Sequence, residues 1–452
     1  MPNRDPDEKE RGHLRPPDAN SVPPTDSQPA CDDLAAVSVS RGLRLHPVES
    51  MLVVAVALAC ALLALIGRTF DPLLRDSFQN VFMQFNWLVP CLLARHWVAL
   101  FEVPAKRARL IYLGYFVALT LALFGSDIES ALTRAYVLRR MGGLVQLVLT
   151  LNGAAFWATV LATCLVWRNR PDHAKAVTRA QLSDLARVLR LLIVFAVFLA
   201  YVSNTKAIIP LVNPNLCDWL LLRFDCSLLF GHSPYEMLSA IHTPTLTSLM
   251  KTSYFFLFFL ISFGFTGTLL FGTVRHFERL FASIVVAGLI ASVLYYALPS
   301  LGPAFAEETR SLLPQIQGGS LRAHLSAKYW DFRADPNGHG VTFLNGLAAF
   351  PSLHIVHALL VLHFLWKLEH TLVYLLLIPF LLMCASTVYL GWHYVFDLVS
   401  AVPITVVCVR LGDRLCGVRR GEESEKRDSE AAAGDGSRQG LSSGEARQAL
   451  TT

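Results

Sequence analysis

The chain has 452 residues, of which 54% are hydrophobic and only 16% are charged, against roughly a quarter charged residues in a soluble domain. This composition excludes an ordinary soluble enzyme and is typical of an integral membrane protein. The net charge of +5 comes from arginines and lysines beside apolar segments, not from a basic face with aromatic residues, so nucleic-acid binding is not expected.

Two polar tails enclose the apolar part of the chain. Residues 1–47 and 413–452 carry too little apolar surface to fold, so we expect disordered cytoplasmic tails. Between them lie about ten apolar stretches, and a membrane-crossing helix needs ~20 such residues. They are 49–67, 81–101, 109–125, 143–167, 187–204, 250–274, 279–299, 353–368, 371–391 and 394–411. The stretch with Arg95 and His96 is the weakest of them and also fits a tilted or re-entrant helix.

Basic residues follow every second apolar stretch. By the positive-inside rule, these ends and both tails are cytoplasmic, although the loop with Arg139 and Arg140 departs from the pattern. We therefore expect a multi-pass protein of the cell membrane, with the long segments 205–249 and 300–352 on the extracytoplasmic side. Connections of this length are usually functional or disordered, and the second one leads directly into a histidine-bearing helix.

The first chemical motif is Pro351-Ser352-Leu353-His354, at the start of the eighth apolar stretch. Proline suits the first turn of a helix, and a serine there can cap free backbone N–H groups, which also attract anions. His354 is then expected in the first helical turn at the outer membrane face. An imidazole in that position can protonate a leaving oxygen.

The second motif joins a histidine to an aspartate. His393 and Asp397 lie four residues apart, so on a helix they share one face. The carboxylate can bind one imidazole nitrogen and leave the other free for nucleophilic attack or proton transfer. Because the ninth and tenth stretches run in opposite directions, we expect His393 at the same membrane level as His354. The three residues predict phosphoryl chemistry through a covalent histidine.

These two segments resemble the second and third motifs of the type 2 phosphatidic acid phosphatase superfamily. Within it they are most similar to the inositolphosphotransferase branch, which includes the inositol-phosphorylceramide synthases. Supporting stretches begin at Ser300 (SLGPAF) and at Asp225 (DCSLLFGHSP). The resemblance covers about residues 200–412 and leaves out the four leading helices.

The resemblance implies a role for each matching residue. His393 would take the phosphoryl group, Asp397 would orient it, and His354 would protonate the departing alcohol. It implies that Ser352 helps to bind phosphate, and we expect Gly391 and Tyr394 to bind substrate as well. It implies no metal and no other cofactor.

The chain departs from the phosphatases at their cationic positions. They carry Ser-Arg ahead of the third-motif histidine, where this chain has Ser386-Thr387. Their first motif is a lysine, six residues and Arg-Pro. Lys206 with Asn213-Pro214 has this spacing, but it lacks the arginine and lies elsewhere in the order of helices, so we interpret it as a chance match. The candidate phosphate-binding cations in the expected loop are Lys328, Arg333 and Arg322. Loss of both arginines favours the transferase branch.

The predicted fold is all-α, a polytopic membrane protein of about ten transmembrane helices with a six-helix catalytic core. Residues 48–180 form N-terminal transmembrane helices of unknown role, because they carry no motif. Residues 181–412 form the lipid phosphatase/phosphotransferase-like membrane domain, between the tails 1–47 and 413–452.

The predicted activity is that of a membrane phosphotransferase that acts on a lipid phosphodiester. Phosphatidylinositol is the candidate donor and a lipid or sugar hydroxyl the acceptor, so the expected partners are membrane lipids. The sequence does not identify a protein partner. The alternative enzyme is a lipid phosphatase for phosphatidic acid or a polyprenyl (pyro)phosphate. The alternative outside enzymes is a catalytically silent transporter or scaffold. A metal site of His354, His357 and His393 is a further alternative, although no supporting carboxylate pattern accompanies it.

Overall fold

The computed structural model describes residues 46–65, 75–125, 153–306, 309, 311–313, 327, 330, 334 and 348–418, with the backbone alone for 75–87, 115, 117–125, 255 and 257–259. Within these residues the chain forms helices joined by turns, and no strand occurs. The all-α prediction is therefore confirmed for the described part.

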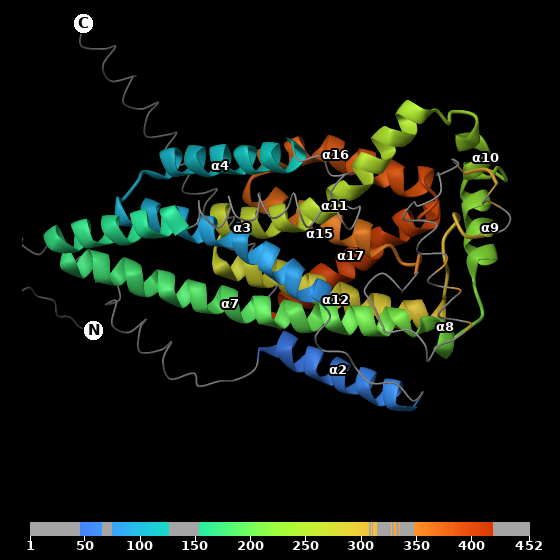
Figure 1. The fold of residues 1–452 in the computed structure, drawn as a ribbon, viewed down its shortest axis with the longest axis horizontal. Helices are drawn as coiled ribbons and strands as arrows, with labels where there is room; N and C mark the ends of the chain where they lie inside the picture. The colour runs from blue at the N-terminus through green and yellow to red at the C-terminus, as the bar shows by residue number, and fades with distance from the viewer. Residues whose placement is uncertain are drawn as a thin grey trace, which may run out of the picture. The chain divides into compact units, whose positions relative to one another are not determined.

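The helices follow one another along the chain as Figure 1 shows. They are α2 (Pro47–Leu65), α3 (Arg75–Leu100), α4 (Ala105–Gly125), α7 (Pro171–Ala207), α8 (Ile209–Val212), α9 (Asp218–Leu228), α10 (Pro234–Ser239), α11 (Pro244–Phe271), α12 (Val274–Ala297), α15 (Leu353–Leu368), α16 (His370–Tyr389) and α17 (Val395–Leu415). Residues 153–169 are helical as well. Each predicted apolar stretch falls on a helix to within a few residues, as far as it is described.

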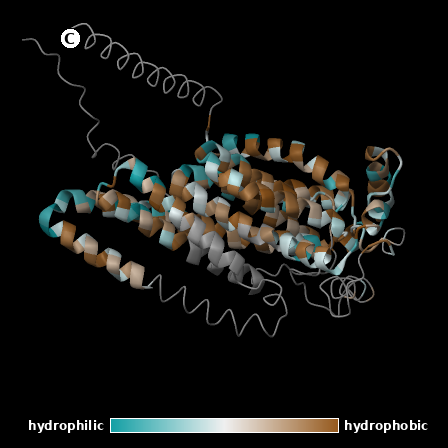
Figure 2. Cartoon of the chain, turned by 90° about the horizontal axis from the view of Figure 1, so that it is seen from above, coloured by the Kyte–Doolittle hydropathy of each residue, from teal (hydrophilic) through white to brown (hydrophobic). Residues whose placement is uncertain are grey.

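Among the described residues, five helices are long and apolar enough to cross a membrane: α2, α7, α12, α16 and α17. Figure 2 shows apolar residues along much of the length of the long helices of the bundle. These features support a multi-pass membrane protein. The ten crossings, the six-helix catalytic core and the cytoplasmic side stay predictions.

Helix α7 is longer than the sequence pattern predicted. The predicted span covered 187–204, whereas the helix runs through 37 residues from Pro171 to Ala207 and crosses the domain boundary expected near residue 180. Pro171 is at its first position, where a missing N–H costs nothing. The added turns contain alanine, leucine, arginine and glutamine, which favour a helix without any apolar stripe.

Polar side chains tie the N-terminal helices to the later ones. Arg95 of α3 donates from Nη1 to the carbonyls of Leu269 (2.6 Å) and Gly272 (3.3 Å), at the end of α11. The Arg95 guanidinium thus binds carbonyls that have no partner inside α11. The stretch with Arg95 and His96 lies in one continuous helix, α3. Two ion pairs join further helices: Arg109–Glu369 and Arg190–Glu49.

The helices with the predicted site residues pack on one another. α11 packs on α15 and α16, α12 packs on α15 and α17, and α7 packs on α12. The short helix α9 contacts α17, and α10 contacts α16, at the end of the long helices where α16 stops and α17 starts (Figure 1). This arrangement brings the start of α15 to the same place.

The described helices reach slightly past the predicted tail boundaries. Pro47 begins α2, and α17 continues to Leu415, two residues beyond 413. Residues 1–45 and 419–452 and the loop with Arg139 and Arg140 lie outside the described residues.

Candidate active site

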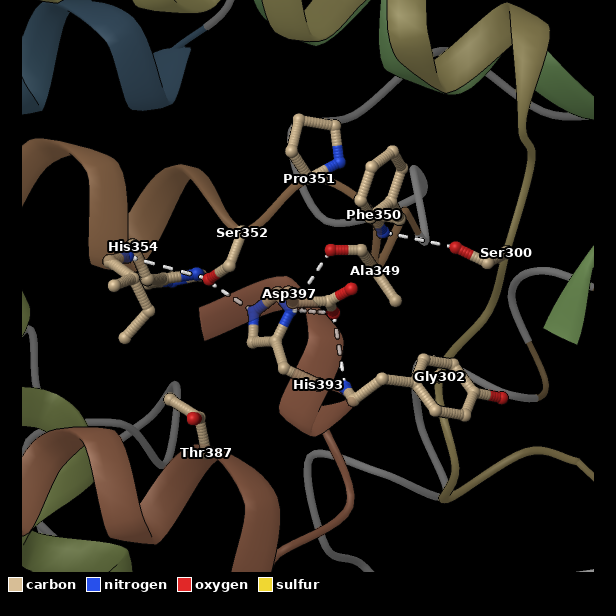
Figure 3. Close-up of polar contacts among 12 residues, drawn as sticks. Ser300, Gly302, Ala349, Phe350, Pro351, Ser352, His354, Thr387, His393 and Asp397 are labelled. Atoms are coloured by element: carbon tan, nitrogen blue, oxygen red, sulfur yellow. Dashed lines mark hydrogen bonds and ion pairs between the residues drawn. The ribbon is translucent and has the colours of Figure 1, made fainter. Parts of the chain in front are cut away.

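His354, His393 and Asp397 come together where α15 and α17 begin (Figure 3). His393 Nδ1 lies 3.1 Å from Asp397 Oδ2, and His393 Nε2 lies 3.3 Å from His354 Nδ1. His393 is only 4% exposed and Asp397 is fully buried. The sequence pattern therefore predicted correctly that these three side chains meet.

The reason for the His393–Asp397 contact differs from the prediction. The two residues do not share a helix face, because His393 lies in the turn before α17 and Tyr394 is the N-cap of that helix. Asp397 is the third helical residue, and its Oδ2 accepts a hydrogen bond of 3.0 Å from the Tyr394 backbone N–H. One carboxylate oxygen thus caps α17 and binds the imidazole.

The hydrogen bonds fix the tautomers of the two imidazoles. His393 Nδ1 lies 2.9 Å from the Ala349 carbonyl and near the Asp397 carboxylate, which both only accept, so Nδ1 carries the proton. In the neutral ring Nε2 then has a free lone pair and accepts from His354 Nδ1–H. The remaining His354 nitrogen faces the Tyr254 hydroxyl at 3.5 Å. The unprotonated nitrogen of His393, Nε2, is the one that can act as a nucleophile.

The segment that begins at Ser300 supports the carbonyl that holds His393. Ser300 accepts from Ala349 N–H at its backbone carbonyl (2.9 Å) and from Phe350 N–H at its hydroxyl (3.0 Å; Figure 3). Because Ala349 then presents its own carbonyl to His393 Nδ1, this loop helps to orient the imidazole. The stretch that the resemblance included thus has a structural role at the site.

Ser352 is the N-cap of α15, as predicted. Its buried hydroxyl accepts from the Ile355 N–H at 3.4 Å, and His354 lies in the first helical turn. Pro351 was expected in that first turn, which is wrong: because Ser352 is the N-cap, Pro351 precedes the helix. The Pro351 carbonyl accepts from the Tyr295 hydroxyl of α12 at 3.2 Å, which fixes the approach to His354.

Asp225 of α9 binds the first turn of α17. Its carboxylate accepts from the backbone N–H groups of Val395 (2.9 Å) and Phe396 (2.8 Å) and from the Tyr235 hydroxyl (3.0 Å). These N–H groups have no partner inside their own helix, and the negative charge also suits the helix dipole. Burial raises the pKa of the Asp225 carboxyl, and the accepted hydrogen bonds oppose that shift. Sequence reasoning quoted this stretch but gave Asp225 no role.

Asp218, also on α9, holds the neighbouring loops. Its carboxylate accepts from the N–H groups of Leu301 (3.1 Å) and Gly302 (2.9 Å) and from the Tyr394 hydroxyl (2.8 Å). Burial raises the pKa of this carboxyl as well. Sequence reasoning missed Asp218, since no local motif marks it.

Two of the predicted substrate-binding residues are engaged inside the protein. Tyr394 is fully buried with its hydroxyl on Asp218, and the Gly391 carbonyl accepts from the Ala304 N–H at 2.8 Å. Both residues therefore hold the turn that carries His393. Lys328, Arg333 and Arg322 lie outside the described residues.

The position of the missing arginine has no free polar group. The hydroxyls of Ser386 and Thr387 donate to the carbonyls of Met383 (2.6 Å) and Cys384 (2.7 Å) in their own helix. The Thr387 carbonyl accepts from the His393 N–H at 3.2 Å. This part of α16 therefore stabilises the His393 turn and offers no charge to an anion.

The metal-site alternative receives no support from the described part of the chain. No three side chains of histidine, cysteine, aspartate or glutamate there have an arrangement that could hold a metal ion. Although His354 and His393 touch, His357 does not join them: its Nε2 is buried without a hydrogen-bond partner among the described residues.

Residues 219–411 match the family model of the PAP2 superfamily, a region that extends from α9 into α17 and includes both histidine motifs. No curated protein and no solved structure matches the chain. The match agrees with the resemblance at the level of the superfamily and leaves its branch open.

Proposed function

We propose that the protein is a membrane phosphotransferase that moves an inositol-phosphate headgroup from a lipid phosphodiester to a lipid or sugar hydroxyl. The observation that carries this proposal is the contact between His393 Nε2 and His354 Nδ1, within a region that matches the PAP2 superfamily. A nucleophile and an acid in one site are the two groups that phosphoryl transfer through a covalent histidine requires.

In the first half-reaction, the lone pair of His393 Nε2 attacks phosphorus and forms an N–P bond. The P–O bond to the departing alcohol breaks, and His354 in its protonated form gives that oxygen a proton. Asp397 acts as a positioning residue, because it holds Nδ1–H and stabilises the positive charge that develops on the ring.

In the second half-reaction, the acceptor hydroxyl attacks phosphorus, its proton goes to His354, and the N–P bond returns its electron pair to His393. The substrate has to enter between the two nitrogens, which lie 3.3 Å apart. Hydrogen bonds of free enzymes often rearrange in this way when substrate binds.

Burial of the site supports transfer over hydrolysis. Ser352 and Asp397 are fully buried and His393 is almost so, and a site that excludes bulk water favours an alcohol over water as acceptor. A lipid phosphatase is the second candidate, since the PAP2 superfamily match is equally compatible with it. We further propose that the site faces the extracytoplasmic side of the cell membrane, which the positive-inside pattern supports.

The test uses purified full-length protein in vesicles with phosphatidylinositol labelled separately in the inositol ring and in the phosphate. After an alkaline quench, a transferase carries both labels on His393, whereas a phosphatase treated with labelled phosphatidic acid carries phosphate alone. The His393→Ala variant should trap neither label. If no phosphate lipid labels the intact protein, and its lipid products equal those of His393→Ala, the protein is no such enzyme and a scaffold or transporter role remains.

A further inference from the structure

Lys206 lies at the end of α7, beside the candidate active site. Its Nζ lies 5.2 Å from the centre of the Tyr295 ring, and the Tyr295 hydroxyl donates to the carbonyl of Pro351, three residues before His354. The charge of Lys206 lies within electrostatic reach of the His354 imidazole. An ammonium group thus approaches the site from the α7–α12 side.

Within the described part of the chain, Lys206 has no ion-pair partner. The neighbouring polar side chains do not bind it either: those of Ser203, Asn204 and Thr205 donate to carbonyls of their own helix. Other cations in the helical region do have partners, as in Arg279–Asp413 and Arg190–Glu49. Because a half-buried ammonium without a counter-ion is unfavourable, its position suits an anion that binds there.

Among the described residues, the other side chains at His393 and His354 bring no positive charge. Asp397 brings a negative charge, the two imidazoles hydrogen-bond to each other, and Thr387 stands where the phosphatases carry an arginine. A phosphodiester adds another negative charge. Electrostatic stabilisation by a fixed cation is a large term in phosphoryl transfer, so a site without one would bind and transfer poorly.

We propose that Lys206 binds the substrate phosphate beside His354 and His393. The proposal rests on the proposed function and adds to it a substrate-binding residue outside the 219–411 match. The order of helices led us to interpret the spacing around Lys206 as a chance match. The packing of α7 on α12 brings this lysine to the site, and chain order alone does not indicate that contact.

A purely structural role is the competing explanation. Lys206 would then only contribute a cation–π contact to Tyr295, worth roughly the same whether or not an anion is present. Loss of the lysine would lower the unfolding temperature and leave anion affinity unchanged. Anion affinity therefore separates the two explanations.

The test measures binding of orthovanadate, a phosphate mimic, to the purified full-length protein by calorimetry. We expect Lys206→Met to bind orthovanadate about 10- to 100-fold more weakly, because it loses one charge-assisted hydrogen bond. Lys206→Arg keeps the charge and should retain most of the affinity. Lys175→Met, the same change at an exposed position of α7, should bind as the intact protein does. If the intact protein binds no orthovanadate, or Lys206→Met binds as tightly as it, the inference is wrong.

Two further comparisons control for misfolding and separate this inference from the proposed function. Should Lys206→Met fail to fold in detergent, Lys206→Gln removes the charge while it keeps a polar side chain, and the same loss of affinity is expected. Turnover that depends on His393 but not on Lys206 would overturn this inference and leave the proposed function intact. Orthovanadate binding that depends on Lys206, in a protein that transfers no lipid phosphate, would support the anion site and contradict the proposed reaction.

Discussion

Asp397 holds His393 through the same oxygen that caps α17. Oδ2 lies 3.1 Å from His393 Nδ1 and 3.0 Å from the Tyr394 backbone nitrogen. The other oxygen, Oδ1, is buried without a hydrogen-bond partner among the described residues. The start of the helix and the orientation of the imidazole therefore depend on one carboxylate oxygen.

Asp397→Asn should reduce phosphoryl transfer by roughly 100- to 10,000-fold, because the amide cannot stabilise the positive ring of the His393 intermediate. The rate of N–P bond formation, measured by rapid quench with a labelled lipid, checks this. Unfolding temperature should also fall, since the amide weakens the hydrogen bonds to the Tyr394 N–H and to His393, so the rate is compared per folded molecule. Asp172→Asn, at an exposed position in the first turn of α7, is the matched control. More than a third of normal activity in Asp397→Asn would contradict the orienting role.

Local patterns predicted the parts of the site that local chemistry determines. Ser352 caps α15 and places His354 in the first turn, because a serine before an apolar run is a common N-cap. The four-residue spacing of His393 and Asp397 predicted their contact, although the geometry is a helix cap and not a helix face. Both geometries bring the two residues together, so spacing alone could not distinguish them.

Long-range contacts were beyond sequence reasoning. Asp225 binds the N–H of Phe396 across 171 positions of the chain, and Asp218 binds the Tyr394 hydroxyl across 176. Neither aspartate belongs to a periodic or spaced pattern that signals a partner. Lys206 had a recognisable spacing, but whether it lies near His354 depends on which helices pack together. Helix packing is a property of the whole fold.

Asp225→Asn should lower the free energy of unfolding by about 1.5–3 kcal/mol, because charge-assisted hydrogen bonds to two N–H groups of α17 are lost. Because α17 follows directly on His393, kcat should fall more than KM changes. Denaturant unfolding and steady-state kinetics measure the two effects. Glu236→Gln, an exposed carboxylate on α10, should leave both unchanged. A destabilised Asp225→Asn with normal kcat would show that α9 does not position His393.

Glu369 gives the protein an acid-sensitive contact between α4 and the start of α16. The hydrogen bond from Arg109 is the main reason that the pKa of this carboxyl is lowered from 4.5 to about 2. A lowered pKa means that the pair stabilises the fold fully above pH 4.5 and loses this contribution as the pH falls towards 2. Arg109 is largely exposed, so solvent screening keeps the effect small.

Thermal unfolding of the intact protein and of Glu369→Gln, measured from pH 6 to pH 3, checks this contribution. The difference between them should be constant above about pH 5 and should shrink below pH 4.5. Arg109→Met removes the cause of the shift, so a further Glu369→Gln change in that background should show little pH dependence. A difference that stays constant down to pH 3 would contradict the ion pair.

Substitutions at two glycines distinguish the cost of backbone strain from the cost of crowding against the His393 turn. Gly302 has φ +99°, and a Cβ there would lie 2.6 Å from the Trp392 carbonyl oxygen. Gly231 has nearly the same φ, +94°, but a Cβ there would meet nothing within 4 Å. Gly231→Ala should therefore cost only the strain of a left-handed alanine, about 1–2 kcal/mol.

Gly302→Ala should cost that strain and a further ~1–3 kcal/mol for the clash, because the Trp392 backbone has to move away. Trp392 directly precedes His393, so this movement should also misplace the nucleophile and reduce transfer, whereas Gly231→Ala should keep normal activity per folded molecule. Denaturant unfolding, followed by activity normalised to the folded fraction, compares the two variants. Equal stability losses and equal normalised activities would mean that the contact between the Gly302 loop and the Trp392 carbonyl does not constrain the site.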